Sequence, residues 1–328
     1  MAAKEHVVLL VAFSGSDIGL GHLSRMKYLR SRLQNLFGLD VFALFIVQAA
    51  PRLRSVSFAN HDDVQMVPLL QKALAEIAKT RASAVVLDLP WKKLTVAQIN
   101  AFVDSIPTGV AITCIDGPCV ELSRPVRQIF PSVGKPVGVR AGVSAEWGPP
   151  WAFAARRRPH WTWESGNDWI LLSGSTNLQK YLDIFISHLE TDKHSPVKFR
   201  WAMGPFSSRS LQKAAHKVGL NPIRPKEFRK AQHEASYSIC RFGVSAIEMM
   251  ALGIPTIILP GWDRSERGEI DAIRDGGLGL VLDELSGLGT SVRGLIHDER
   301  KGGEMSRRCL DTFGAPTATQ LRGALGLS

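Results

Sequence analysis

The sequence has little cysteine and no cluster of metal ligands. Its 328 residues include four cysteines, Cys114, Cys119, Cys240 and Cys309. Four cysteines are too few for a disulfide framework in a chain of this length. Cys114 and Cys119 lack the partner ligands that a zinc site requires. We therefore expect free, mostly buried thiols and no metal ion.

Long hydrophobic runs are also missing. No apolar stretch approaches the roughly 18 residues that cross a bilayer as a helix. The short apolar run that begins at Val7 leads into a glycine turn, not into the cleavage site of a secretory signal. The sequence therefore predicts a cytoplasmic protein of two domains, each large enough to bury its own core.

Acidic residues are outnumbered, with 30 Asp and Glu against 40 Lys and Arg, and the formal net charge is +10. Such a charge suits an anionic partner. A negatively charged nucleotide-sugar, an anionic membrane surface and an acidic polymer all remain open, and the second would place the protein peripherally on the inner face of the membrane. The basic residues are dispersed and no nucleic-acid module is recognised, so no specific nucleic-acid binding is expected.

Short apolar runs alternate with amphipathic helical patterns along the N-terminal half. This alternation predicts an α/β fold with a parallel sheet covered on both faces. Ligands of such sheets bind beyond the carboxyl ends of the strands, where His22, Asp88 and Asp116 are expected. A second alternating half follows an irregular stretch over residues 134–168. The strands expected from the pattern are 7–13, 41–47, 84–88, 110–115, 169–172, 199–203, 237–240, 255–259 and 279–282, and the helices include 23–36, 69–79, 96–103, 178–189, 211–218 and 244–252.

The first motif with chemical content runs from Gly19 to Arg25 and includes Gly21 and His22. A glycine turn between a strand and a helix places backbone N–H groups and the positive end of a helix dipole at one point, which suits an anionic ligand such as a diphosphate. His22 can exchange a proton there, since imidazole does so near neutral pH. The alternative is a histidine that only caps the helix or binds phosphate. For Arg25, a phosphate contact and a surface position both remain open.

The second motif follows the expected strand at 237–240 and contains Gly243, Ser245 and Glu248. Ser245 falls in the first turn of the expected helix and Glu248 one turn later. A carboxylate near a glycine-rich helix start can accept hydrogen bonds from a ribose diol. The alternative is an exposed glutamate, because Glu is a common helix former.

Together these motifs resemble the GT-B glycosyltransferase-like enzymes. The resemblance is closest to the UDP-sugar hydrolase of pseudaminic acid biosynthesis and its spore-coat polysaccharide relatives, and more distant to the GlcNAc transferase that completes the lipid-linked peptidoglycan precursor. The motifs that carry it are Gly19 to Arg25, the strand ending in Asp88, the strand ending before Asp116, the segment 170–177 and Gly243 to Glu248 with Gly253 to Pro255.

The resemblance implies a GT-B architecture of two Rossmann-like domains whose parallel sheets face a central cleft. The implied domains are 1–155, for the catalytic and acceptor side, 156–310, for the nucleotide, and a C-terminal segment 311–328 that packs back on the first domain. It further implies a UDP-sugar substrate, no cofactor and no metal ion. The implied activity is inverting hydrolysis at the anomeric carbon, with inverting glycosyl transfer as the first alternative and non-catalytic binding of a nucleotide-sugar or an anionic polymer as the second.

The resemblance also assigns roles to residues. His22 and Asp88 are the candidate catalytic residues. The diphosphate and nucleotide contacts are expected at Gly19, Gly21, Gly174, Ser175, Thr176, Gly243, Ser245 and Glu248. The sugar or acceptor contacts are expected at Asp17, Asp116, Asp263 and Glu266, with a solvated loop as the alternative for the last two. Asp88 and Asp17 are the alternative bases to His22.

The chain departs from the hydrolase pattern at three places. Ser173 stands where relatives have a first glycine, and Gly117 where they have a second Asp. The segment Gly261 to Arg267 replaces the usual Asn-Gln pair that holds the sugar. The nucleotide half of the pattern is therefore kept, while the part that recognises the sugar is altered.

Overall fold

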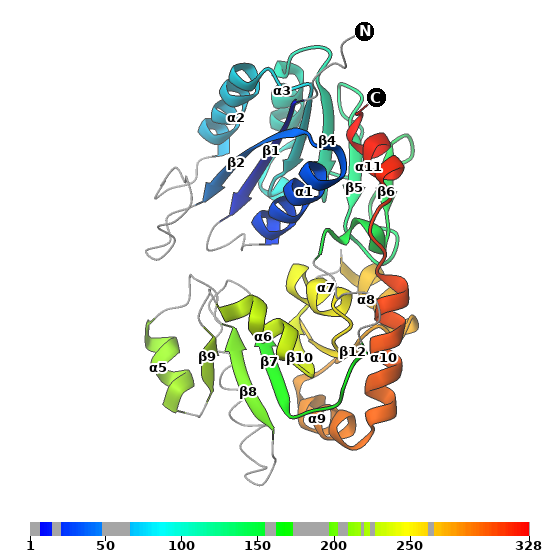
Figure 1. Ribbon diagram of the computed structural model, residues 1–328. Helices are drawn as coiled ribbons and strands as arrows, with labels where there is room; N and C mark the ends of the chain where they lie inside the picture. The colour runs from blue at the N-terminus through cyan, green and yellow to red at the C-terminus, as the bar shows by residue number, and fades with distance from the viewer. Residues whose placement is uncertain are drawn as a thin grey trace. The chain divides into compact units, whose positions relative to one another are not determined.

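The computed structural model describes residues 7–14, 21–47, 66–154, 162–172, 197–202, 209–217, 220–223, 227–261 and 266–327. The chain divides into two compact units (Figure 1). The N-terminal unit comprises Met1–Phe153 and Ala315–Ser328, and the C-terminal unit comprises Ala154–Gly314. The second unit is thus continuous in sequence, whereas the first is completed by residues that follow it.

The N-terminal unit is built on a six-stranded parallel sheet with the strand order β2-β1-β3-β4-β5-β6. Its elements are β1 (Val7–Ser14), α1 (Gly21–Phe37), β2 (Asp40–Val47), α2 (Met66–Thr80), β3 (Ala84–Asp88), α3 (Val96–Ser105), β4 (Ala111–Ile115), β5 (Arg127–Phe130), β6 (Ala145–Trp147) and α11 (Ala318–Leu325).

Alternate residues of β1 face two different apolar layers, because successive side chains of a strand point to opposite faces of the sheet. Val8, Leu10 and Ala12 pack with α1 and α11, while Leu9 and Val11 pack with α2 and α3. Both layers are fully buried, which explains why β1 is an unbroken apolar run. The helix α11 contributes Leu321, Ala324 and Leu325 to the first of these layers, and Leu327 follows the helix in the same layer.

The C-terminal unit has a second six-stranded parallel sheet, in the order β12-β11-β10-β7-β8-β9. Its elements are β7 (Asp168–Leu172), β8 (Lys198–Ala202), α5 (Arg209–Lys217), β9 (Asn221–Ile223), α6 (Phe228–Glu234), β10 (Tyr237–Arg241), α7 (Val244–Ala251), β11 (Thr256–Leu259), α8 (Arg267–Asp275), β12 (Leu280–Val281), α9 (Leu288–His297) and α10 (Glu299–Thr312). The predicted α/β class with two parallel sheets is confirmed.

Most predicted elements lie within three residues of their observed bounds, but the irregular stretch predicted over 134–168 contains the short strand β6. Among its tryptophans, Trp151 is buried in the N-terminal core and Trp163 packs edge-on against Tyr237, as expected for packing residues. Trp161 and the helix predicted over 178–189 lie outside the described residues. None of the helices described is long and apolar enough to cross a membrane.

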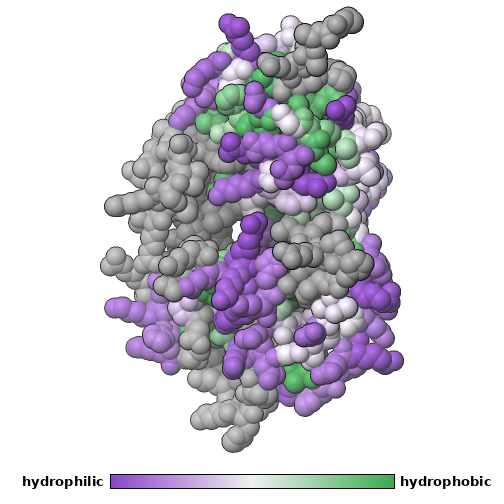
Figure 2. Space-filling model, in the orientation of Figure 1, coloured by the Kyte–Doolittle hydropathy of each residue, from purple (hydrophilic) through white to green (hydrophobic). Residues whose placement is uncertain are grey.

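The helix α10 is amphipathic. Gly302, Met305 and Cys309 are buried, while its outer surface is hydrophilic in Figure 2. Gly302 lies against the ring of Trp163, and a Cβ atom on Gly302 would come within 2.6 Å of Trp163 Cη2. That ring is fixed by a 2.7 Å hydrogen bond from its Nε1 to the carbonyl oxygen of Ser236.

We expect Gly302→Ala to lower the free energy of unfolding by about 1–3 kcal/mol, because the fixed ring cannot accommodate a methyl group without strain. Gly303→Ala is the matched control. Its Cβ would lie 3.8 Å from the same ring, so the variant should gain up to about 1 kcal/mol of helix propensity. Urea denaturation of both variants measures this. Equal stability of the two would show that the ring does not restrict position 302.

Candidate active site

The carboxyl edge of the N-terminal sheet holds the candidate catalytic residues. The helix α1, which follows β1, packs on one face of the sheet, and α3, which follows β3, packs on the other. Adjacent strands whose following helices leave to opposite faces form a topological switch point, the usual ligand-binding crevice of an open α/β sheet. His22 is the second residue of α1 and Asp88 is the last residue of β3. Both therefore lie at the β1/β3 switch point.

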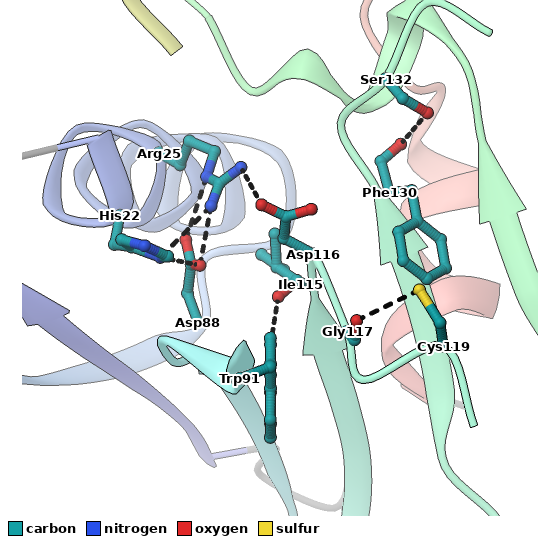
Figure 3. A network of polar contacts seen from close by, with 10 residues as sticks. All are labelled: His22, Arg25, Asp88, Trp91, Ile115, Asp116, Gly117, Cys119, Phe130 and Ser132. Carbon is teal, nitrogen blue, oxygen red and sulfur yellow. Dashed lines mark hydrogen bonds and ion pairs between the residues drawn. The ribbon is translucent and has the colours of Figure 1, made fainter. Parts of the chain in front are cut away.

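Asp88 is the centre of a polar network (Figure 3). Its carboxylate is completely buried and accepts two hydrogen bonds from Arg25, from Nε to Oδ2 at 3.1 Å and from Nη2 to Oδ1 at 2.8 Å. Oδ1 is also in contact with Nδ1 of His22. His22 and Arg25 are three residues apart on α1, so they lie on the same face of the helix. A fork of two parallel bonds is the most specific way to bind a carboxylate.

The charges of this network support one another. Burial alone would raise the pKa of Asp88, but Arg25 and then His22 outweigh this and lower the pKa below its usual value. Burial likewise acts to lower the pKa of Arg25, yet the two carboxylates of Asp88 and Asp116 raise it overall. At neutral pH the pair is therefore a carboxylate and a guanidinium, removed together from water.

The ionised state of Asp88 determines how His22 is protonated. A carboxylate can only accept hydrogen bonds, so Nδ1 of His22 carries the proton and donates it to Asp88. Nε2 of the neutral ring is then left with a lone pair. The His22 side chain is 16% exposed, enough for a small ligand or water to reach it. This pairing of a buried carboxylate with a histidine is how a general base is oriented in many hydrolases.

Asp116 forms the outer end of the network. It follows β4 and adopts the left-handed backbone conformation with φ of 55°. Its backbone N–H donates to the carbonyl oxygen of Ile129 at 2.8 Å, which fixes the turn. Its Oδ2 lies 3.6 Å from Nη1 of Arg25, and its side chain is 56% exposed. The guanidinium of Arg25 thus lies between a buried carboxylate and one that faces solvent.

The chain beyond Asp116 is held by the buried side chain of Gln128. Its Oε1 accepts the backbone N–H of Cys119 at 3.0 Å, and its Nε2 donates to the carbonyl oxygen of Val120 at 2.8 Å. Gly117 allows the amide to approach, because a Cβ atom there would lie 2.7 Å from Oε1. A glycine at position 117 therefore leaves the room that the side chain of Gln128 occupies.

The C-terminal unit contains a second switch point, between β7 and β10, where the strand order reverses. Gly243 follows β10 with φ of 141°, a conformation that favours glycine, and it is the N-cap of α7. Ser245 and Glu248 are the second and fifth residues of α7, and both are half-buried. The N–H groups at this helix start suit an anion.

The other residues predicted for the site are placed as follows. Gly21 is the first residue of α1, and Glu266 is the N-cap residue of α8 without capping it by its side chain. The predictions for Asp17, Gly19, Gly174, Ser175, Thr176 and Asp263 lie outside the described residues.

Sequence reasoning left open whether Arg25 binds phosphate or lies on the surface of its helix. The structure shows a buried side chain, 4% exposed, bound to Asp88. This contact could have been predicted from the sequence, because His22 and Arg25 are spaced to lie on one helical face and another expected strand ends in aspartate.

Within the described ranges, no group of three or more His, Cys, Asp or Glu residues could hold a metal ion.

Comparison with known proteins identifies the fold class. No protein-family model and no curated protein matches the chain. Among solved structures, MnaA of S. aureus in a co-structure with UDP is 12% identical, with a TM-score of 0.61 and coverage of 98% of each chain. A UDP-GlcNAc 2-epimerase from Neisseria meningitidis, bound to UDP-GlcNAc, is 14% identical with a TM-score of 0.59, covering 92% of this chain and 94% of that one.

A third similar structure is the spinosyn rhamnosyltransferase SpnG with thymidine diphosphate. It is 12% identical with a TM-score of 0.57, and the match covers 97% of this chain and 99% of that one. These likenesses extend over both units and establish the GT-B fold. The first of these structures contains UDP, the second UDP-GlcNAc and the third thymidine diphosphate.

Proposed function

We propose that this protein is an enzyme that hydrolyses a nucleoside-diphosphate sugar, with a UDP-linked sugar as the first candidate substrate. The observation that carries the proposal is the network of His22, Asp88 and Arg25 at a switch point of a GT-B fold. It provides an oriented base where such sheets bind ligands. The nucleotides bound to the similar structures support the substrate class.

In the proposed reaction, Nε2 of His22 accepts a proton from water as the water oxygen attacks the anomeric carbon. The bond between that carbon and the diphosphate oxygen breaks, and the diphosphate leaves with the electron pair. Attack on the face opposite the leaving group inverts the anomeric centre. Asp88 stabilises the imidazolium that forms, as a buried carboxylate does beside a histidine base.

The nucleotide contacts are proposed for the C-terminal unit. Glu248 would accept hydrogen bonds from the ribose hydroxyls, and the glycine turn at Gly243, together with Gly174 to Thr176, would hold the diphosphate through backbone N–H groups. These N–H groups would stabilise the charge that develops on the departing diphosphate. Asp116 is the proposed sugar contact of the N-terminal unit, because its exposed carboxylate lies beside Arg25.

Inverting glycosyl transfer is the second candidate. The observation that favours it is the similarity to a rhamnosyltransferase over nearly the whole of both chains. The chemistry is the same except that a sugar hydroxyl replaces water as the nucleophile. The two candidates differ in whether a nucleotide-sugar is turned over without an acceptor.

The test begins with thermal stabilisation by UDP, GDP, CMP, dTDP and ADP. One nucleotide should raise the melting temperature selectively, since a ligand that binds only the folded state stabilises it. Glu248→Gln should reduce that shift. The matching nucleotide-sugars are then incubated with the enzyme, and the product anomer is read by proton NMR before it mutarotates.

Release of the free sugar with inverted configuration supports hydrolysis, and turnover only with an added acceptor supports transfer. An epimerised nucleotide-sugar would replace both proposals with epimerisation. A selective thermal shift without turnover of any conjugate would instead identify a non-catalytic binding protein. If none of the nucleotides shifts the melting temperature, the nucleotide-sugar proposal fails.

A further inference from the structure

We propose that Arg25 is a positioning residue that sets the tautomer of His22 through Asp88. The proposal rests on the function proposed for His22, and it concerns a buried residue that does not touch the reacting atoms. Arg25 is 4% exposed, and its fork occupies both oxygens of Asp88. The role of Arg25 follows from the hydrogen bonds that each atom of the network can donate or accept.

Arg25 determines the charge of Asp88. An isolated carboxylate with no exposed surface would take up a proton, because burial strongly disfavours the charged form. Arg25 supplies the opposite charge at 2.8 Å. Its own charge is not lost in the interior, since a guanidinium stays protonated in proteins. Arg25 is thus the group that keeps Asp88 an acceptor of hydrogen bonds.

The charge of Asp88 in turn determines which nitrogen of the His22 ring carries the proton. With Asp88 ionised, Nδ1 must carry the proton, and Nε2 is a proton acceptor. If Asp88 is protonated, its hydroxyl donates to Nδ1 instead, and the ring proton moves to Nε2. In that form Nε2 can no longer accept a proton from water. In the proposed tautomer, the 3.3 Å contact between Arg25 Nη2 and His22 Nδ1 joins two nitrogens that both donate to Oδ1 of Asp88.

Apart from His22, the described residues that face Asp88 include no other group besides Arg25 that can carry a positive charge. From α1, Asp88 faces His22 and Arg25. From β4 it faces Cys114, whose thiol stays neutral because burial and the charge of Asp88 raise its pKa. The remaining neighbour is Asp116, a carboxylate that pairs with the outer side of Arg25.

The test compares Arg25→Gln with Arg25→Lys, and uses Arg30→Gln as the control. Arg30 is exposed on the same helix. We expect Arg25→Gln to lower kcat at neutral pH by about 10²- to 10⁴-fold, the range for loss of general base catalysis, with little change in KM. The loss should diminish as pH rises, because Asp88 ionises again and restores the productive tautomer. Arg25→Lys keeps the charge without the fork and should retain much of the activity.

The deciding measurement needs no substrate. Nitrogen-15 correlation spectra of the imidazole rings report which ring nitrogen carries the proton, and the signal absent from His22→Gln identifies His22. The expected result is a proton on Nδ1 in the wild type, in Arg25→Lys and in Arg30→Gln, and on Nε2 in Arg25→Gln. A wild-type proton on Nε2, or a proton that stays on Nδ1 in folded Arg25→Gln, overturns the proposal.

These outcomes distinguish a failure of the proposed function from a failure of the role proposed for Arg25. If no nucleotide-sugar is turned over, the proposed function fails while the tautomer result stands. If Arg25→Gln does not fold, as circular dichroism would show, the wild type and Arg25→Lys still decide: a proton on Nε2 in either contradicts the role of Arg25. A kcat that falls equally at every pH would show a merely structural contribution.

Discussion

His22→Ala should reduce kcat for the nucleotide-sugar by about 10²- to 10⁴-fold, the contribution typical of a general base. The substitution removes the only proposed proton acceptor of the water nucleophile. The fold should persist, because Asp88 keeps both hydrogen bonds from Arg25. Steady-state kinetics with the substrate found by the nucleotide screen measure the effect.

Two controls accompany this variant. The thermal shift produced by the nucleotide should be unchanged in His22→Ala, since the proposed nucleotide contacts lie in the C-terminal unit. His297→Ala, a substitution of an exposed histidine at the end of α9, should turn over substrate as the wild type does. Normal turnover by His22→Ala would remove His22 as the base and move that role to Asp88 or Asp17, the two alternatives that the sequence left open.

Asp88→Asn should have the second large effect, on stability. It leaves the guanidinium of Arg25 buried without its carboxylate, and breaking one partner of a buried ion pair costs about 3–5 kcal/mol. The nearly equal size of Asn isolates the loss of charge from any change in packing. Urea denaturation at neutral pH measures the loss.

The difference between wild type and Asp88→Asn should also depend on pH. The folded protein holds the pKa of Asp88 below the ordinary value of 3.8. A lowered carboxyl pKa stabilises the folded state at every pH above the unfolded value, and this stabilisation is lost as pH falls from 3.8 to the folded pKa. The gap in unfolding free energy should therefore be constant at higher pH and narrow below 3.8. A gap that widens in acid would contradict this assignment of charge.

The sequence predicts the strands of both sheet centres well, because they are buried on both faces and appear as continuous apolar runs. The strands β5, β6 and β9 were not predicted; β6 and β9 are edge strands, and β5 pairs with β6. β5 and β6 contain four and three residues, in a stretch interrupted by glycine and proline. β9 includes a proline, Pro222, which normally argues against a strand away from an edge. Their pairing is set by the neighbouring strand rather than by local pattern.

The candidate site was predictable as far as strand ends determine it. His22, Asp88 and Asp116 each follow or end a buried strand, and carboxyl ends of parallel strands share one edge of the sheet. The role of Arg25 could not be read in the same way. An arginine on an amphipathic helix is exposed unless a partner lies opposite it, and that partner is 63 residues away in the sequence. The contact follows from the packing of α1 on the sheet.

The position of α11 has a consequence for the order in which the chain acquires structure during synthesis. Its residues complete an apolar layer of the N-terminal unit, and the carbonyl oxygen of Ala324 accepts a hydrogen bond from Thr113 on β4 at 3.0 Å. On the ribosome, α11 emerges only after the whole of Ala154–Gly314. The unit that begins first is therefore completed last. On this face α1 can already cover its sheet, but the part that α11 covers stays exposed while the continuous C-terminal unit can already fold. Any factor that shields that surface during translation would act on the N-terminal unit.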